Sequence, residues 1–152
     1  MIKLFGVGNI LLCDDAVGVR VLEKLLPFIK SLFSPIEAFI GETDCFFCLD
    51  NINENDFVII IDATYLNIEP GSVSYFTFSE CNRFITPSQS AHEMTLLKIL
   101  RLEYPKINGY LIGIEVARIT FSLELSMVLQ HKLERICSEI LKFLESVVKT
   151  YA

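Results

Sequence analysis

The chain has 152 residues, a length typical of one domain with a proper core, and we expect residues 1–152 to form a single domain. Its formal charge of −6 argues against a general nucleic-acid or anionic-membrane surface, because such surfaces are basic. Although 52% of the residues are hydrophobic, no run approaches the roughly 18–20 apolar residues of a membrane span, and no export signal is recognisable. We therefore expect a cytoplasmic protein.

Strand-like and helix-like segments alternate in the first part of the chain. An apolar strand is predicted at 2–8, and a helix at about 15–30 has apolar residues at helical spacing. A second strand at about 36–41 leads to a short helix, and a third strand at 57–61 ends at Asp62. The third run is apolar on both faces, which predicts a central strand.

The second part of the chain continues the alternation. A Pro-Gly turn at 70–71 leads into a fourth strand at about 72–78, and this short link predicts an antiparallel strand at a sheet edge. A capping box begins a helix at about 90–103, and a fifth strand at 110–114 precedes a last helix at about 126–149. The pattern predicts a three-layer α/β/α fold. Its middle layer is a five-stranded, mostly parallel twisted sheet with one antiparallel edge strand.

Ionisable residues follow three of the predicted connections. Asp14 and Asp15 come after the first strand, Asp62 ends the third, and His92 lies in the first helical turn after the fourth. Because loops at the carboxyl ends of the strands converge in an open α/β sheet, these groups can reach one place. Two carboxylates and an imidazole suit a divalent ion such as nickel or zinc. Each residue also has a simpler interpretation, as a helix cap or a solvated side chain.

Two other kinds of site fit the same region less well. The Gly-x-Gly at 6–8 resembles the start of a dinucleotide-binding turn, but Leu11 occupies the third glycine position and Asp15 would face the phosphates. Cys13 and His92 could form a nucleophile pair, although no third group is evident to orient the base.

The five cysteines are an odd number at irregular spacing, which favours free thiols. Cys45 and Cys48 form a Cys-x-x-Cys, but the second pair that a zinc site needs is absent from the sequence. The simpler interpretation is that Cys48 packs with the neighbouring phenylalanines. His131 falls on the polar stripe of the last helix, so we expect it at the surface.

The order of these motifs resembles that of the hydrogenase maturation endopeptidases, which remove a C-terminal peptide from the precursor of the nickel-iron hydrogenase large subunit. The resemblance covers nearly the whole chain. It rests on the following residues, in chain order: Gly6 to Leu12, Asp14, Asp15, Gly18, Gly41, Thr43, Ile61 to Thr64, Glu69 to Gly71, His92, and Leu111 to Glu115.

The resemblance implies that Asp15, Asp62 and His92 contact nickel already inserted in the precursor, so that the substrate's own metal licenses cleavage. Zinc or cadmium could act as a surrogate. It implies a metal-dependent endopeptidase of the aspartic type that acts as a monomer on the precursor, without membrane insertion. Asp14, Asp15 and Asp62 are the candidate catalytic residues, and a carboxylate outside the ligand set, such as Asp14, could take a proton from water.

The sequence departs from the family pattern in several loops. Glu42 stands where many relatives have glycine, Cys45 replaces another small residue, and Val116 replaces a proline. Glu42, Thr43 and Phe46 are candidates for bordering the groove that receives the precursor tail. A second functional hypothesis is a non-catalytic nickel-sensing chaperone that binds the hydrogenase precursor, because the same ligand set would serve a sensor.

Overall fold

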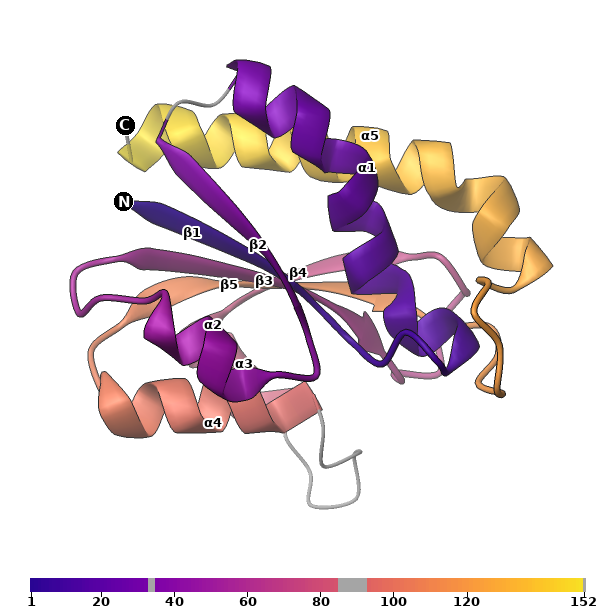
Figure 1. The fold of residues 1–152 in the computed structure, drawn as a ribbon, viewed down its shortest axis with the longest axis horizontal. Helices are drawn as coiled ribbons and strands as arrows, with labels where there is room; N and C mark the ends of the chain where they lie inside the picture. The colour runs from indigo at the N-terminus through magenta and orange to yellow at the C-terminus, as the bar shows by residue number, and fades with distance from the viewer. Residues whose placement is uncertain (33–34, 85–92, 152) are drawn as a thin grey trace.

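The computed structural model describes residues 1–32, 35–84 and 93–151. Within these residues one five-stranded sheet lies between two layers of helices, as Figure 1 shows. The order of strands is β2-β1-β3-β5-β4, with β4 antiparallel at one edge and the others parallel. The predicted α/β fold is confirmed. The strands are β1 (Ile2–Val7), β2 (Ile36–Glu42), β3 (Phe57–Thr64), β4 (Val73–Thr77) and β5 (Asn108–Glu115).

Helices cover both faces of the sheet. α1 and α5 form one layer, and α2, α3 and α4 form the other (Figure 1). The helical elements are the 3₁₀ turn η1 (Cys13–Ala16), α1 (Val17–Leu32), α2 (Cys45–Asp50), α3 (Phe78–Phe84), α4 (Glu93–Glu103) and α5 (Met127–Tyr151).

The sheet separates two apolar cores. Successive side chains of a strand point to opposite faces, so Leu4 packs in the core under α1 and α5 whereas Phe5 packs in the core under α2 and α4. Ile59 and Ile60 divide in the same way on β3. Burial on both faces explains the continuous apolar run of β3 and its central position, as predicted.

Two glycines bring the first helical segment close to the sheet. A Cβ on Gly18 would lie 2.2 Å from the carbonyl oxygen of Ile61. Gly8 has φ +138°, and a Cβ there would lie 2.1 Å from the carbonyl oxygen of Asp15. Only glycine fits such positions without displacement of the backbone. These close approaches place η1 beside the carboxyl ends of β1 and β3, where the site is built.

Several predicted bounds change in the structure. The first predicted helix divides into η1 and α1, and β3 continues to Thr64, so that Asp62 lies inside a strand. Helix α3 was not predicted, although Thr77 caps its start: Thr77 Oγ1 accepts from Glu80 N at 3.2 Å and donates to Glu80 Oε1 at 3.1 Å. The capping box predicted at 90–93 reaches outside the described residues.

The last helix is amphipathic. His131 lies on its exposed face, as predicted. The buried residues of α5 follow helical spacing along the face that packs on the sheet and α1: Leu129, Ile136, Ile140, Leu144 and Val147.

Among the helices that the structure describes, none combines the length and the apolar character needed to cross a membrane.

Candidate active site

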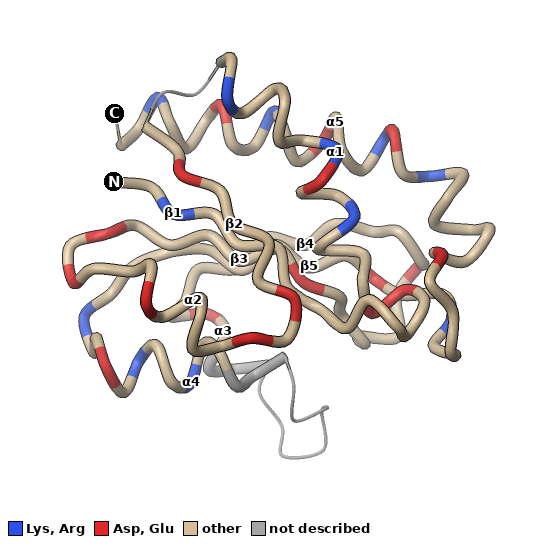
Figure 2. The backbone as a smooth tube through the Cα atoms, in the orientation of Figure 1, with Lys and Arg blue, Asp and Glu red and all other residues tan. Residues whose placement is uncertain are grey.

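A pocket of about 120 Å³ opens at the carboxyl ends of β1, β2 and β3. A cavity of this size holds a few water molecules, an ion or one side chain. No described residue that lines it is lysine or arginine, and Figure 2 shows acidic residues gathered at this end of the sheet. The pocket therefore favours a cationic group. Four acidic residues contribute to the lining: Asp15, Glu42, Asp44 and Asp62.

Asp15 is half-buried and is held at both carboxylate oxygens. Its Oδ2 accepts a hydrogen bond from the backbone N–H of Asn9 at 2.8 Å, and its Oδ1 accepts from the hydroxyl of Tyr65 at 2.6 Å. An ionised carboxylate has about four acceptor positions, so acceptor capacity is left on each oxygen. Asp15 is thus fixed in place and still able to bind a ligand.

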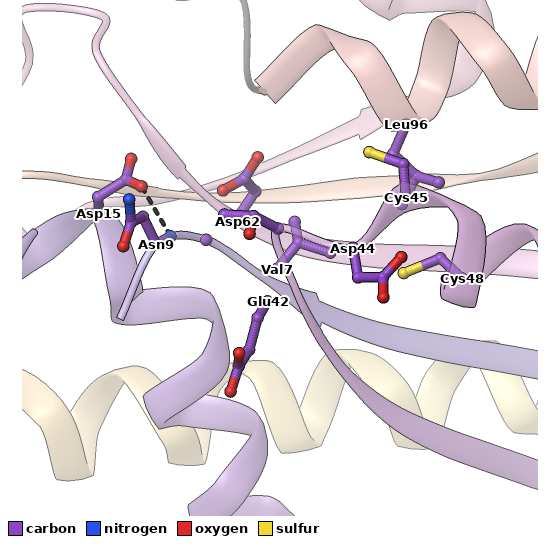
Figure 3. A pocket seen from close by; sticks show the side chains of 11 residues that line it. Val7, Asn9, Asp15, Glu42, Asp44, Cys45, Cys48, Asp62 and Leu96 are labelled. Carbon is purple, nitrogen blue, oxygen red and sulfur yellow. Dashed lines mark hydrogen bonds between the residues drawn. The ribbon is translucent and has the colours of Figure 1, made fainter. Parts of the chain in front are cut away.

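Asp62 lies near the end of β3 and is only 3% exposed. Its Oδ1 accepts a hydrogen bond from the N–H of Ala63 at 2.7 Å. In Figure 3 the carboxylates of Asp15 and Asp62 project to the same side, whereas that of Glu42 points the opposite way. A buried carboxylate is stabilised by donors or by a nearby cation. The structure therefore brings together two of the three predicted metal-contacting residues.

Asp14 faces away from this pocket. Its side chain is fully buried and accepts hydrogen bonds from the N–H groups of Ala117, Arg118 and Ser126 and from the Ser126 hydroxyl, at 2.8–2.9 Å. These four donors occupy the usual acceptor positions of a carboxylate. The geometry gives Asp14 a structural role, in contrast to the proton-accepting role predicted for it.

His92, the predicted third ligand, lies outside the described residues. Among the residues that are described, no group of three or more His, Cys, Asp and Glu side chains is arranged to hold a metal ion. Asp15 and Asp62 are the part of the predicted ligand set whose placement is described, and carboxylate oxygens are suitable ligands for a divalent ion.

Two residues of this region were not predicted to have a role. Tyr65 contacts Asp15, as described above, and no local pattern marks it. Glu115 is 3% exposed and accepts hydrogen bonds from Thr64 Oγ1 at 2.9 Å, Leu66 N at 2.9 Å and Asn67 N at 3.1 Å. Glu115 belongs to a motif of the family resemblance, so its presence there was the one available signal. It shapes the turn that follows Asp62.

The sequence comparisons agree with this architecture. Residues 35–143 match the family model described as hydrogenase maturation protease. The chain belongs to this family. The Hydrogenase 2 maturation protease of Escherichia coli (strain K12) is 32% identical over 113 residues, which cover 69% of this chain and 67% of that protein.

Other relatives extend the comparison. The hydrogenase expression/formation protein HupD of Thiocapsa roseopersicina is 28% identical over 120 residues, covering 75% of this chain and 53% of that protein. The match thus spans about half the length of that relative. Among solved structures, the hydrogenase maturating endopeptidase HybD from E. coli aligns with 96% of this chain and 93% of that chain, with 27% identity and a TM-score of 0.78. The family membership is therefore accompanied by a shared fold.

Of the three groove residues predicted from the family pattern, two belong to the pocket lining. Glu42 and Thr43 line the pocket, and Phe46 is 73% exposed in the first turn of α2. Glu42 has φ 48°, in the left-handed region that favours glycine. Glycine, which the family pattern leads us to expect at this position, adopts such a conformation without strain. Here the position is occupied by a glutamate whose carboxylate points away from those of Asp15 and Asp62 (Figure 3).

The Cys-x-x-Cys at the start of α2 has the properties of protonated thiols. Burial raises the pKa of Cys48 to about 12, and burial followed by the charges of Asp44 and Asp62 raises the pKa of Cys45. Reactive and metal-binding cysteines need the thiolate, which a raised pKa disfavours. Cys48 is 1% exposed in the core that contains Phe5, which agrees with the packing interpretation.

Cys13 does not line the pocket. It is buried beside Asp14, and burial raises its pKa, with the Asp14 charge acting in the same direction. A buried, protonated thiol that faces the 117–126 segment is poorly suited to act as a nucleophile. The structure gives no support to a Cys13-based nucleophile pair.

Proposed function

We propose that this protein is an endopeptidase that removes the C-terminal extension of a nickel-iron hydrogenase large-subunit precursor after nickel insertion. Nickel in the precursor would serve as the recognition feature. Membership of the hydrogenase maturation protease family supports the reaction class. The observation that carries the proposal is the joint placement of Asp15 and Asp62 in one acidic pocket without a lining lysine or arginine among the described residues. We expect a monomer that acts in the cytoplasm.

Asp15 and Asp62 would contact the nickel that the precursor carries, with His92 as a third ligand. Two carboxylates and one imidazole leave coordination positions for the precursor's own ligands and for water. A metal held there would polarise the scissile carbonyl or a water molecule. Since donors occupy the acceptor positions of Asp14, we assign the proton-accepting role to the carboxylate of Asp15 or Asp62, two residues that line the pocket.

The test is co-expression of this protein with the large subunit from the same genome, with and without nickel, followed by intact mass spectrometry. We expect a nickel-dependent loss of a short C-terminal peptide, which Asp62→Asn abolishes. Asp50→Asn is the matched control because Asp50 is exposed at the end of α2 and does not line the pocket. A nickel-loaded precursor that stays full length beside the wild-type protein would overturn the protease and favour the nickel-sensing chaperone.

A further inference from the structure

We propose that Tyr65 is a positioning residue that orients the Asp15 carboxylate toward the metal carried by the substrate. This inference rests on the proposed function, in which Asp15 contacts that metal. Tyr65 lies outside the predicted ligand set and outside the pocket lining, so its role would be to act through Asp15.

The contact has the geometry of a strong hydrogen bond. The Tyr65 hydroxyl donates to Asp15 Oδ1 at 2.6 Å, which is within the short range of hydrogen bonds to an ionised acceptor. On the other side, the Asn9 N–H donates to Oδ2 at 2.8 Å. With one donor on each oxygen, the carboxylate plane is fixed, and the acceptor positions that are left have a set direction.

The position of Tyr65 is itself determined by the neighbouring strand. Glu115 on β5 pairs with Thr64 on β3, and its carboxylate accepts hydrogen bonds from the Thr64 hydroxyl and the Leu66 N–H on either side of Tyr65. The Tyr65 ring is half-buried and packs against the core under α1 and α5. Backbone and ring together hold the hydroxyl at Asp15, so that Glu115 acts on the pocket through Tyr65.

Removal of the hydroxyl alone should separate this role from a role in folding. Tyr65→Phe keeps the ring packing and the backbone hydrogen bonds to Glu115, while Asp15 Oδ1 loses a donor. Loss of a partner that orients a metal ligand typically lowers metal affinity about 10- to 100-fold. We therefore expect weaker ion binding with an unchanged midpoint of thermal unfolding.

The experiment is calorimetric titration of the full-length protein with Ni²⁺ and with Cd²⁺, for the wild type and Tyr65→Phe, together with thermal unfolding of each. Tyr104→Phe is the matched control, because the Tyr104 hydroxyl donates to the Ile52 carbonyl at 3.3 Å, in the connections that lead into β3 and β5 at the end of the sheet opposite the pocket. We expect Tyr65→Phe to bind about 10- to 100-fold more weakly and Tyr104→Phe to bind as the wild type does.

If Tyr65→Phe folds poorly, a second variant and a second measurement still test the role of Tyr65. Glu115→Gln removes the charge that holds the turn, and we expect a smaller loss of ion affinity in the same direction. In the processing assay, Tyr65→Phe should raise KM for the nickel-loaded precursor more than it lowers kcat, because binding of the metal-bearing group is what Asp15 orientation controls.

The outcomes separate this inference from the function it rests on. Equal ion affinity of Tyr65→Phe and the wild type overturns the role of Tyr65 and leaves the protease proposal intact. An equal loss in Tyr104→Phe also overturns it, because the effect would then be unrelated to Asp15. If the wild type binds neither ion and Asp62→Asn still processes the precursor, the metal contact proposed for the pocket carboxylates fails and this inference fails with it, while the removal of the C-terminal extension stands.

Discussion

Asp14 and Asp15 follow one another in η1, yet their carboxylates belong to two different regions of the molecule. Asp14 is fully buried and is surrounded by four donors from the 117–126 segment. Asp15 is half-buried, receives one donor on each oxygen and faces the pocket. The comparison shows how an acidic pair can divide between stability and ligand binding, according to how many donors the fold supplies to each carboxylate.

The Asp14 region is a loop held by polar contacts. Phe121 is 86% exposed and Leu123 is 66% exposed, so these large side chains contribute little to the core. The segment is instead tied to the turn before η1, where Ser122 exchanges backbone hydrogen bonds of 3.0 Å with Leu11 and Cys13. Hydrogen bonds to a charged group contribute roughly 1.5–3 kcal/mol each, which makes Asp14 the main anchor of the segment.

The largest expected effect is a loss of stability in Asp14→Asn. The amide keeps one acceptor oxygen but turns an NH₂ group toward N–H or O–H donors, so at least one buried donor loses its partner. We expect the free energy of unfolding to fall by about 3 kcal/mol. Urea denaturation of this variant and of Asp50→Asn measures it. A change no larger than that of the exposed Asp50 control would contradict the anchoring role.

The second prediction is that Asp15→Asn, unlike Asp14→Asn, lowers activity much more than stability. Asp15→Asn should reduce nickel-dependent processing by at least about 100-fold, because a metal-binding carboxylate becomes a neutral amide. Its free energy of unfolding should change by less than about 1 kcal/mol, since the side chain is half-buried. Processing and urea denaturation are measured on the same preparations. If Asp15→Asn severely destabilises the protein but leaves processing intact, Asp15 has the stabilising role and the prediction is contradicted.

The third prediction concerns the thiols beside the pocket. Because burial raises the pKa of Cys48 to about 12, the thiol stays protonated at pH 8 and its thiolate becomes abundant only as the pH approaches that value. Alkylation by iodoacetamide at pH 8 should be at least about tenfold slower in the native protein than in the urea-unfolded protein. Peptide mass spectrometry follows Cys48 directly. Equal rates would show that the thiol is exposed and reactive.

The smallest expected effect is that of an exposed apolar side chain in the 117–126 segment. Phe121→Ser should change the free energy of unfolding by less than about 0.5 kcal/mol, because an exposed side chain loses little packing. Together with Asp14→Asn in the same denaturation series, it tests whether the polar anchor or the apolar side chains hold the segment. A loss as large as that of Asp14→Asn would assign the stability to the apolar side chains.

Much of the fold was predictable because its signals are local. The apolar run of β3 predicted a buried central strand, and the short Pro-Gly link at 70–71 predicted the antiparallel edge strand β4. Helix α3 also had a local signal in Thr77 and Glu80. It is short and directly follows a strand, however, and in such a segment hydrophobic periodicity does not distinguish a helix from a strand.

Part of the site was also predictable from the sequence, and part of it was not. Sequence alone determined which chemical groups follow which strands, and the convergence of Asp15 and Asp62 follows from the topology of a parallel sheet. Only the tertiary structure decided that Asp14 turns away, because its donors come from residues 103 to 112 positions later in the chain. It likewise placed Tyr65, 50 positions away, against Asp15. Hydrogen-bond partners so distant leave no local pattern, since they depend on how the strands and loops pack.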